Sequence, residues 1–250
     1  MISAHYNHPT SAVPSHQPNN NDCSIVPVTA LALLHQPKRQ HIYHLLECPP
    51  SEPLPVVPAP TEASFPLAVG ITELVGPAGS GKTQLALGLL RQAAAASSTA
   101  LYLALDKDNI PSLAHRLNQM NANLNNIVLC RVRNEEELLQ ITPRDFGLII
   151  VDSLAGMFRS TPTVQRSDFL FRLAALWKQW AIPIVVINQL SLARPALGLA
   201  WENCVNASFM VDRTTQSGTR TLTVRLSSHM VVGTSKNFVI ETTGPRVTTA

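Results

Sequence analysis

The feature that most constrains this chain is a glycine-rich loop between a short apolar run and an amphipathic run. Its eight residues are Gly76, Pro77, Ala78, Gly79, Ser80, Gly81, Lys82 and Thr83. Glycines let the backbone curl so that its amides point at an anion, and the helix that follows adds a positive dipole end. At this spacing the lysine reaches the β- and γ-phosphates and the threonine hydroxyl binds magnesium. The loop therefore predicts a site for a nucleoside triphosphate with Mg²⁺.

A magnesium site in an open parallel sheet also needs a carboxylate at the carboxyl end of a neighbouring strand. Residues 148–151 are all apolar, which is typical of a strand buried on both faces, and Asp152 follows them directly. We therefore expect Thr83 and Asp152 to share the metal. An aspartate that merely ends a strand is the alternative.

Bulk composition excludes several classes of protein. The net charge of +3 is too small to predict nucleic-acid binding by itself, and the four cysteines are scattered without a C-x-x-C spacing. That argues against a zinc ribbon or a disulfide framework and favours a reducing intracellular compartment. We expect no membrane span, because no stretch reaches the roughly 18 consecutive apolar residues that one requires.

Composition also divides the chain near residue 66. The first 66 residues hold 12 of the 19 prolines and 6 of the 8 histidines. We expect residues 1–65 to be a Pro/His-rich, largely disordered tail, with histidines that are solvated rather than metal ligands. Residues 66–250 are expected to form one domain that contains the nucleotide site.

Short apolar runs alternate with longer amphipathic runs after residue 66. Such alternation predicts an α/β fold with a mainly parallel sheet flanked by helices. From residue 203 strands follow one another without helices, which predicts an antiparallel extension at the C-terminus. The expected strands are 71–75, 100–105, 127–132, 148–151, 182–187, 205–212, 219–226 and 237–242, and the expected helices are 82–96, 109 onward, 134 onward and 167–180.

Several stretches together resemble RecA-type recombinases, in particular the eukaryotic recombinase paralogues. The resemblance covers residues 66–246, and its motifs are 71–85, 151–159, Asn188-Gln189, 195–201 and 210–213. It implies a RecA-like P-loop ATPase core that binds ATP and Mg²⁺ and acts in homologous-recombination repair in the nucleus. It also implies a hetero-oligomer with other recombinase paralogues, and contact with single-stranded or branched DNA. By the same resemblance Lys82 and Gln189 are catalytic, Gln189 as the sensor of the γ-phosphate.

Three departures from the family pattern bear on activity. Where the family has a glutamate that activates water, this chain has Asp106, which is one methylene shorter. The segment 191–194, where a long DNA-binding loop is expected, is short. The usual N-terminal helical module is not recognisable. We therefore expect a weak DNA-dependent ATPase at most, with Arg159 and Arg166 as candidate phosphate contacts for DNA.

Two other functions remain open at this point: a small-molecule kinase on a P-loop fold, and an assembly scaffold that binds ATP without hydrolysing it. No arginine-rich lid is evident, which counts against the kinase. Trp177 and Trp180 are interpreted as core packing rather than base stacking. Phe65-Pro66-Leu67-Ala68 has a Phe-x-x-Ala form that is too short to be diagnostic.

Overall fold

The computed structural model describes residues 67–105, 110–143, 145–158, 162–191, 194–216 and 218–248, together with a short strand at 25–27. All other residues of the predicted tail lie outside these ranges. The division between a disordered tail and an ATP-binding domain therefore stays a prediction. The part of the chain that the structure describes contains no helix long and apolar enough to cross a membrane.

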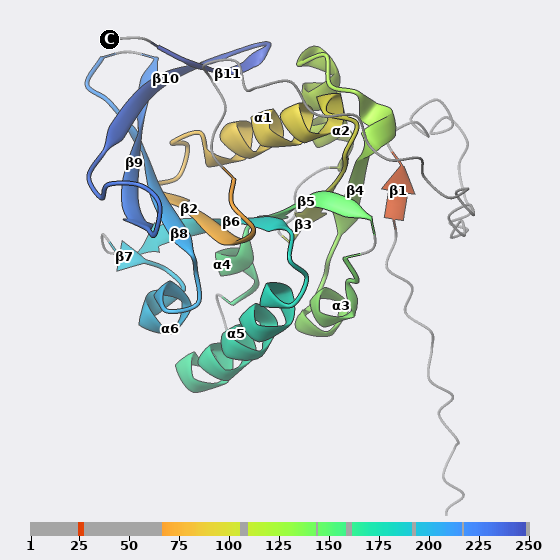
Figure 1. Ribbon diagram of the computed structural model, residues 1–250, viewed down its shortest axis with the longest axis vertical. Helices are drawn as coiled ribbons and strands as arrows, with labels where there is room; N and C mark the ends of the chain where they lie inside the picture. The colour runs from red at the N-terminus through yellow and green to blue at the C-terminus, as the bar shows by residue number, and fades with distance from the viewer. Residues whose placement is uncertain are drawn as a thin grey trace, which may run out of the picture.

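A twisted, mainly parallel sheet forms the centre of the molecule, and the predicted α/β class is confirmed (Figure 1). Its strands occur in the spatial order β1-β4-β3-β5-β6-β2-β8-β9-β10-β11. Neighbours from β4 to β8 run parallel, and those from β8 to β11 run antiparallel. The parallel strands are β2 (Gly70–Gly76), β3 (Thr99–Ala104), β4 (Ile127–Arg131), β5 (Phe146–Asp152), β6 (Pro183–Ser191) and β8 (Ala207–Arg213).

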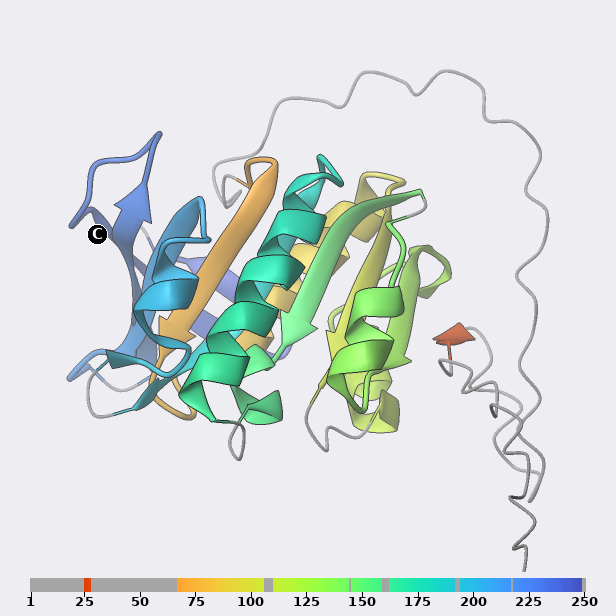
Figure 2. The same ribbon diagram turned by 90° about the horizontal axis from the view of Figure 1, so that it is seen from below.

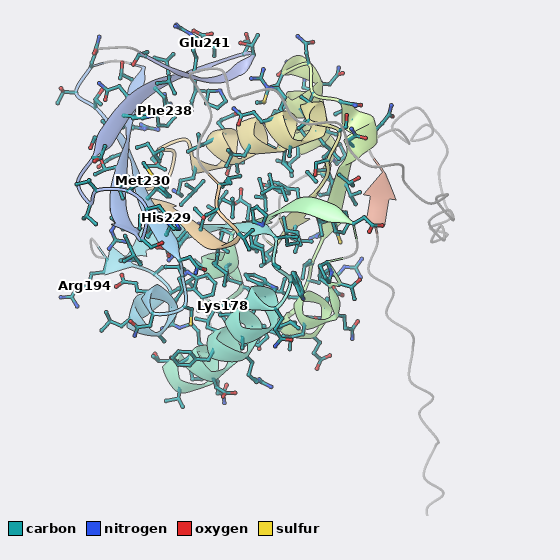
Figure 3. The ribbon with its side chains drawn as sticks, in the orientation of Figure 1. Lys178, Arg194, His229, Met230, Phe238 and Glu241 are labelled. Atoms are coloured by element: carbon teal, nitrogen blue, oxygen red, sulfur yellow. The ribbon has the colours of Figure 1, made fainter. Side chains whose placement is uncertain are left out.

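The antiparallel extension curls over one face of the sheet (Figure 1). It consists of β9 (Thr219–Ser227), β10 (Ser235–Glu241) and β11 (Gly244–Val247). Phe238 of β10 is buried in the core, whereas Glu241 at the end of the same strand is exposed (Figure 3). This alternation is expected of strands with one face in the core and one in water.

Helices cover both faces of the sheet and create two hydrophobic cores (Figure 2). The core on one face lies beneath α1 (Lys82–Ala95) and α2 (Ile110–Gln119). The other lies beneath α3 (Glu135–Gln140), α4 (Leu154–Met157), α5 (Thr163–Lys178) and α6 (Gly198–Glu202). Trp177 is buried in this second core against Trp201, as the packing interpretation predicted. Trp180 packs against it from a half-buried position.

Most predicted elements occur within two residues of their expected ends, with a few corrections. Helix α5 begins at Thr163 rather than Ser167, and strand β6 extends to Ser191 rather than ending at Ile187. Six short elements were not predicted: α4, α6, β11, the 3-10 helix η2 (Leu124–Asn126), the strand β1 described below, and the two-residue strand β7 (Arg194–Pro195), which pairs with β6. Each is seven residues or fewer, too short to show a hydrophobic period.

One short strand occurs within the segment expected to be disordered. Strand β1 (Ile25–Pro27) pairs antiparallel with β4, with Val26 opposite Leu129. A strand of three residues is compatible with a tail that is largely disordered, and that expectation stays a prediction. Because β4 is otherwise the last strand of the sheet, β1 covers its edge.

Helix α1 begins at the end of the glycine-rich loop, so its packing should decide how firmly the loop is held. Leu90 of α1 is fully buried. Leu90→Ala should lower the free energy of unfolding by about 2–5 kcal/mol, because the removed methyl groups leave a cavity. The exposed Val164 of α5 is the control, and Val164→Ala should change stability by about 0.5 kcal/mol or less. Urea denaturation followed by circular dichroism measures both, and equal losses would contradict the assignment of this core.

Candidate nucleotide-binding site

The glycine-rich loop lies between the carboxyl end of β2 and the first turn of α1, as the sequence predicted. Gly79 and Gly81 adopt φ angles of 71° and 105°, in the left-handed region that side chains disfavour. Ser80 N donates to Pro77 O at 3.2 Å, which closes the turn. The loop therefore curls back on itself and leads directly into the positive end of a 14-residue helix.

Lys82 turns back over the loop. Its buried Nζ donates to Gly76 O at 2.8 Å and to Pro77 O at 2.7 Å. Burial lowers the pKa of this ammonium below its ordinary value, and the nearby Asp152 carboxylate opposes the shift. The carbonyls hold the charge at the loop, where an oxygen of a bound phosphate would meet it.

The predicted pair Thr83 and Asp152 is in direct contact. Thr83 Oγ1 donates to Asp152 Oδ2 at 2.7 Å, across the 69 residues that separate them in sequence. Tyr102 at the core of β3 donates its hydroxyl to the same oxygen at 2.6 Å. Tyr102 was not predicted, because nothing in a strand sequence shows which of its side chains faces a neighbouring carboxylate. Two hydroxyls thus orient one buried carboxylate at the end of β5.

This donor set fits Mg²⁺ bound together with a nucleotide. Within the described ranges, no three His, Cys, Asp or Glu side chains gather to hold a metal ion. Mg²⁺ does not need such a cage, since it keeps several waters and binds through one or two protein oxygens plus phosphates. Thr83 Oγ1 and Asp152 Oδ2 are the oxygens that would hold it. Their function as ligands stays a prediction.

Gln189 lies next to the loop because of the register between two parallel strands. In the pairing of β2 with β6, Gly76 is opposite Gln189. The backbone of Gln189 is held on both sides: its N–H donates to Asn188 Oδ1 at 2.8 Å, and its carbonyl accepts from Ala196 N at 2.8 Å. These two hydrogen bonds fix the position of the Gln189 backbone at the edge of the site, and its side chain is half-buried there.

Two arginines that the sequence did not single out as site residues lie against the loop. Arg213 donates to Gly79 O from Nε at 3.1 Å and from Nη2 at 2.8 Å. Arg220, its partner across β8 and β9, packs beside Gly81, where an added Cβ would lie 3.0 Å from its Nε. Neither guanidinium forms an ion pair with a described residue. They therefore add positive charge beside the anion site, and the hairpin register that places them is not readable from sequence.

The structure does not test the remaining predicted site residues. Asp106 and Arg159 lie outside the described residues, so their functions stay predictions. Arg166 lies on the first turns of α5, where its Nη2 is 3.5 Å from Thr163 Oγ1. Nothing in this position tests its predicted contact with DNA.

Substitution of Gly81 by alanine should destabilise the protein more than the same substitution at Gly218, which also has a positive φ angle but no close neighbours. A Cβ at Gly81 would lie 2.6 Å from Ile240 Cδ1, whereas Gly218, with φ of 80°, has nothing within 4 Å. Each alanine variant carries the positive-φ strain of about 1–3 kcal/mol. Gly81→Ala also requires the Ile240 and Arg220 side chains to shift, so it should have the lower midpoint of thermal unfolding. Equal midpoints for Gly81→Ala and Gly218→Ala would show that β10 does not confine the loop.

The sequence was compared with family models and with curated proteins. No family model matches the chain. The DNA repair protein XRCC3 homolog of Arabidopsis thaliana is 29% identical over 209 residues, which cover 57% of this chain and 69% of that protein. Protein RecA of Caulobacter vibrioides is 33% identical over 92 residues, which cover 35% of this chain and 25% of RecA.

Solved structures agree on the fold. The RadB recombinase superposes with a TM-score of 0.59 at 22% identity, covering 72% of this chain and 91% of that one. A KaiC-like protein from Pyrococcus horikoshii superposes with a TM-score of 0.63 at 14% identity, covering 74% and 91%. At these identities the superpositions show the RecA-like fold alone. Together with the sequence similarities, they support a resemblance of this chain to RecA-type recombinase paralogues, among them the XRCC3 homolog.

Proposed function

We propose that this protein binds ATP and Mg²⁺ and assists strand exchange in homologous-recombination repair of double-strand breaks. The observation that carries the proposal is the contact between Thr83 and Asp152 beside Lys82. A hydroxyl, a carboxylate and an ammonium lie together where the glycine-rich loop ends and helix α1 begins. The hydroxyl and the carboxylate match magnesium, and the ammonium matches the phosphates of a nucleoside triphosphate.

The site supports binding more strongly than hydrolysis. In the proposal Lys82 holds the β- and γ-phosphates, Gln189 contacts the γ-phosphate, and Asp106 is the group that would activate water. An aspartate is one methylene short of the glutamate that the family uses, so its carboxylate is poorly placed for that step. We therefore propose a weak DNA-dependent ATPase at most. An assembly scaffold that binds ATP without turnover is the alternative.

Partners and location follow from the resemblance to a DNA repair protein. We propose that the chain works in the nucleus within a hetero-oligomer of recombinase paralogues. We also propose that it contacts single-stranded or branched DNA weakly, with Arg159 and Arg166 near the phosphates. Co-purification of recombinase paralogues from cells supports this assignment, and their absence contradicts it.

Binding is tested with a fluorescent ATP analogue in the presence and absence of Mg²⁺. The wild-type chain should bind, and Mg²⁺ should increase the affinity. Lys82→Ala should abolish binding, because it removes the cation that meets the phosphates. Lys178→Ala, on the exposed side of α5, is the matched control and should bind like wild type (Figure 3). Equal binding by both variants would refute the assignment of the loop.

Turnover is measured as phosphate release with and without single-stranded DNA, using Lys82→Ala as the blank. Stimulation by DNA supports the recombination ATPase, whereas binding without turnover supports the scaffold. Phosphate transfer to a metabolite would instead establish a kinase.

Asp106→Glu should raise ATP turnover. The added methylene extends the carboxylate toward the water that must lose a proton, and a positioned general base contributes roughly 10²–10⁴-fold to rate. Asp106→Asn is the control of similar size and should lower any turnover further. An unchanged steady-state rate for pure, folded Asp106→Glu protein would show that this position is not the base.

A further inference from the structure

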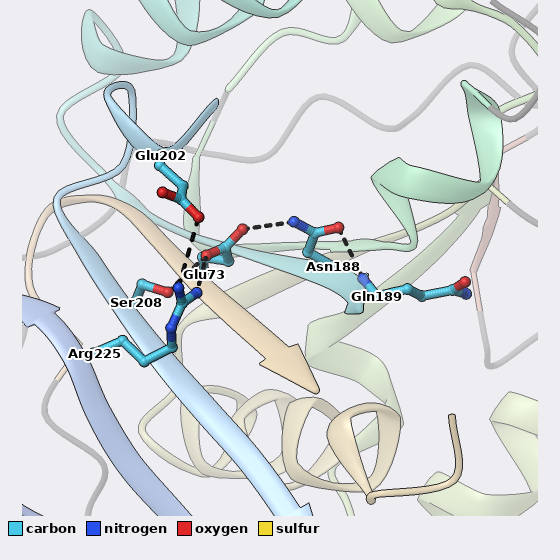
Figure 4. A network of polar contacts seen from close by, with 6 residues as sticks. All are labelled: Glu73, Asn188, Gln189, Glu202, Ser208 and Arg225. Carbon is cyan, nitrogen blue, oxygen red and sulfur yellow. Dashed lines mark hydrogen bonds and ion pairs between the residues drawn. The ribbon is translucent and has the colours of Figure 1, made fainter. Parts of the chain in front are cut away.

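A carboxylate is buried in the middle of the sheet, three residues before the loop. Glu73 lies on β2, and its exposed fraction is 0%. A charged group in such a place needs partners, and three neighbouring strands supply them (Figure 4). Asn188 Nδ2 on β6 donates to Oε1 at 2.8 Å, and Ser208 Oγ on β8 donates to Oε2 at 2.6 Å. Arg225 Nη1 on β9 lies 4.0 Å from Oε2.

Glu73 determines which way the amide of Asn188 faces. A carboxylate only accepts hydrogen bonds, so Asn188 must turn its Nδ2 toward it. The Oδ1 atom then faces the other way and accepts from the backbone N–H of Gln189 at 2.8 Å. If the amide were reversed, Asn188 Oδ1 would face the Glu73 carboxylate and Nδ2 would face the N–H of Gln189, and neither pair can form a hydrogen bond. The carboxylate therefore acts on the backbone of Gln189 through one intervening side chain.

The other end of this network reaches the surface. Arg225 forms ion pairs with both Glu73 and Glu202, the last residue of helix α6. The distance from Arg225 Nη2 to Glu202 Oε1 is 3.6 Å. A second contact holds Gln189 near α6: Ala196 N, in the segment that leads into this helix, donates to Gln189 O. Gln189 is thus anchored at its N–H through Asn188 and at its carbonyl through Ala196. Neither anchor depends on a bound nucleotide.

We propose that Glu73 is a positioning residue for recognition of the γ-phosphate. By orienting Asn188 it holds Gln189 at the edge of the site, opposite the first glycine of the loop. The protein would then distinguish a nucleoside triphosphate from a diphosphate through a buried group that touches neither. This inference rests on the proposed function, in which Gln189 contacts the γ-phosphate.

The test compares dissociation constants for ATPγS and ADP, both with Mg²⁺, because their ratio reports the γ-phosphate alone. Glu73→Leu removes the acceptor for Asn188 without leaving a charge in the sheet. It should lower the preference for ATPγS about fivefold, the value of roughly one hydrogen bond, while the ADP constant stays within about twofold. Glu73→Gln keeps an oxygen for Asn188 and should retain most of the preference.

Ser208→Ala is the matched control, because it removes a buried hydrogen bond of Glu73 that does not lead to Gln189. It should lower stability and leave the ratio unchanged. Asn188→Ala removes the side chain that connects Glu73 to Gln189 and keeps the carboxylate, so it should lower the ratio as Glu73→Leu does. It therefore tests the proposal even if Glu73→Leu fails to fold. In the double variant Asn188→Ala/Gln189→Ala, the ratio should equal that of Gln189→Ala alone, because both changes act on one contact.

The outcomes separate the two levels of the proposal. If wild type binds neither nucleotide, the proposed function itself is wrong. If wild type binds both and Gln189→Ala lowers the ratio while Asn188→Ala and Glu73→Leu do not, only the positioning inference is overturned. It is equally overturned if affinity for ADP falls as much as affinity for ATPγS, because Glu73 then supports the fold alone.

Discussion

The register between two parallel strands governs the placement of nearly everything in the site. Strands β2 and β6 pair so that Gly76 is opposite Gln189, and β5 beside β6 ends at Asp152. Because parallel strands end at a common edge, a loop, an amide and a carboxylate from distant parts of the chain converge there. A slip of one residue in β6 would turn Asn188 toward the opposite core and separate it from Glu73. The buried contact between these two side chains therefore also favours the correct register.

The distribution of charge around the loop is more informative than the net charge. The chain carries only +3 overall, yet Lys82, Arg213 and Arg220 all lie at the loop. Backbone carbonyls, rather than carboxylates, hold Lys82 and Arg213 in place. A neutral carbonyl leaves the positive charge of such a side chain largely available to an anion. Asp152 is the carboxylate that faces this group, which suits a site that takes both a metal ion and phosphates.

The parts of the site that could be predicted from sequence are those set by local spacing. The loop, Lys82 and Thr83 follow from an eight-residue motif, and Asp152 follows from its position after four apolar residues. Thr83 and Asp152 were expected to lie together because the glycine-rich loop and Asp152 both stand at the carboxyl ends of parallel strands. Tyr102, Arg213 and the network around Glu73 were not predictable in this way, because each depends on which strands are neighbours and which side chains share a face. Sheet order joins β2 to β8 across 130 intervening residues, and no local pattern encodes that pairing.

The last strand completes the packing of the first helix. A Cβ at Gly88 of α1 would lie 2.6 Å from Pro245 Cγ, so β11 rests directly on the helix that begins at the phosphate loop. On the ribosome α1 emerges some 150 residues before the strand that covers it, since synthesis runs from the N-terminus. Until then one side of α1 is open to water or to another protein. Helix α1 is therefore synthesised well before the strand that encloses it, and the surroundings of the glycine-rich loop are complete only once β11 has been made.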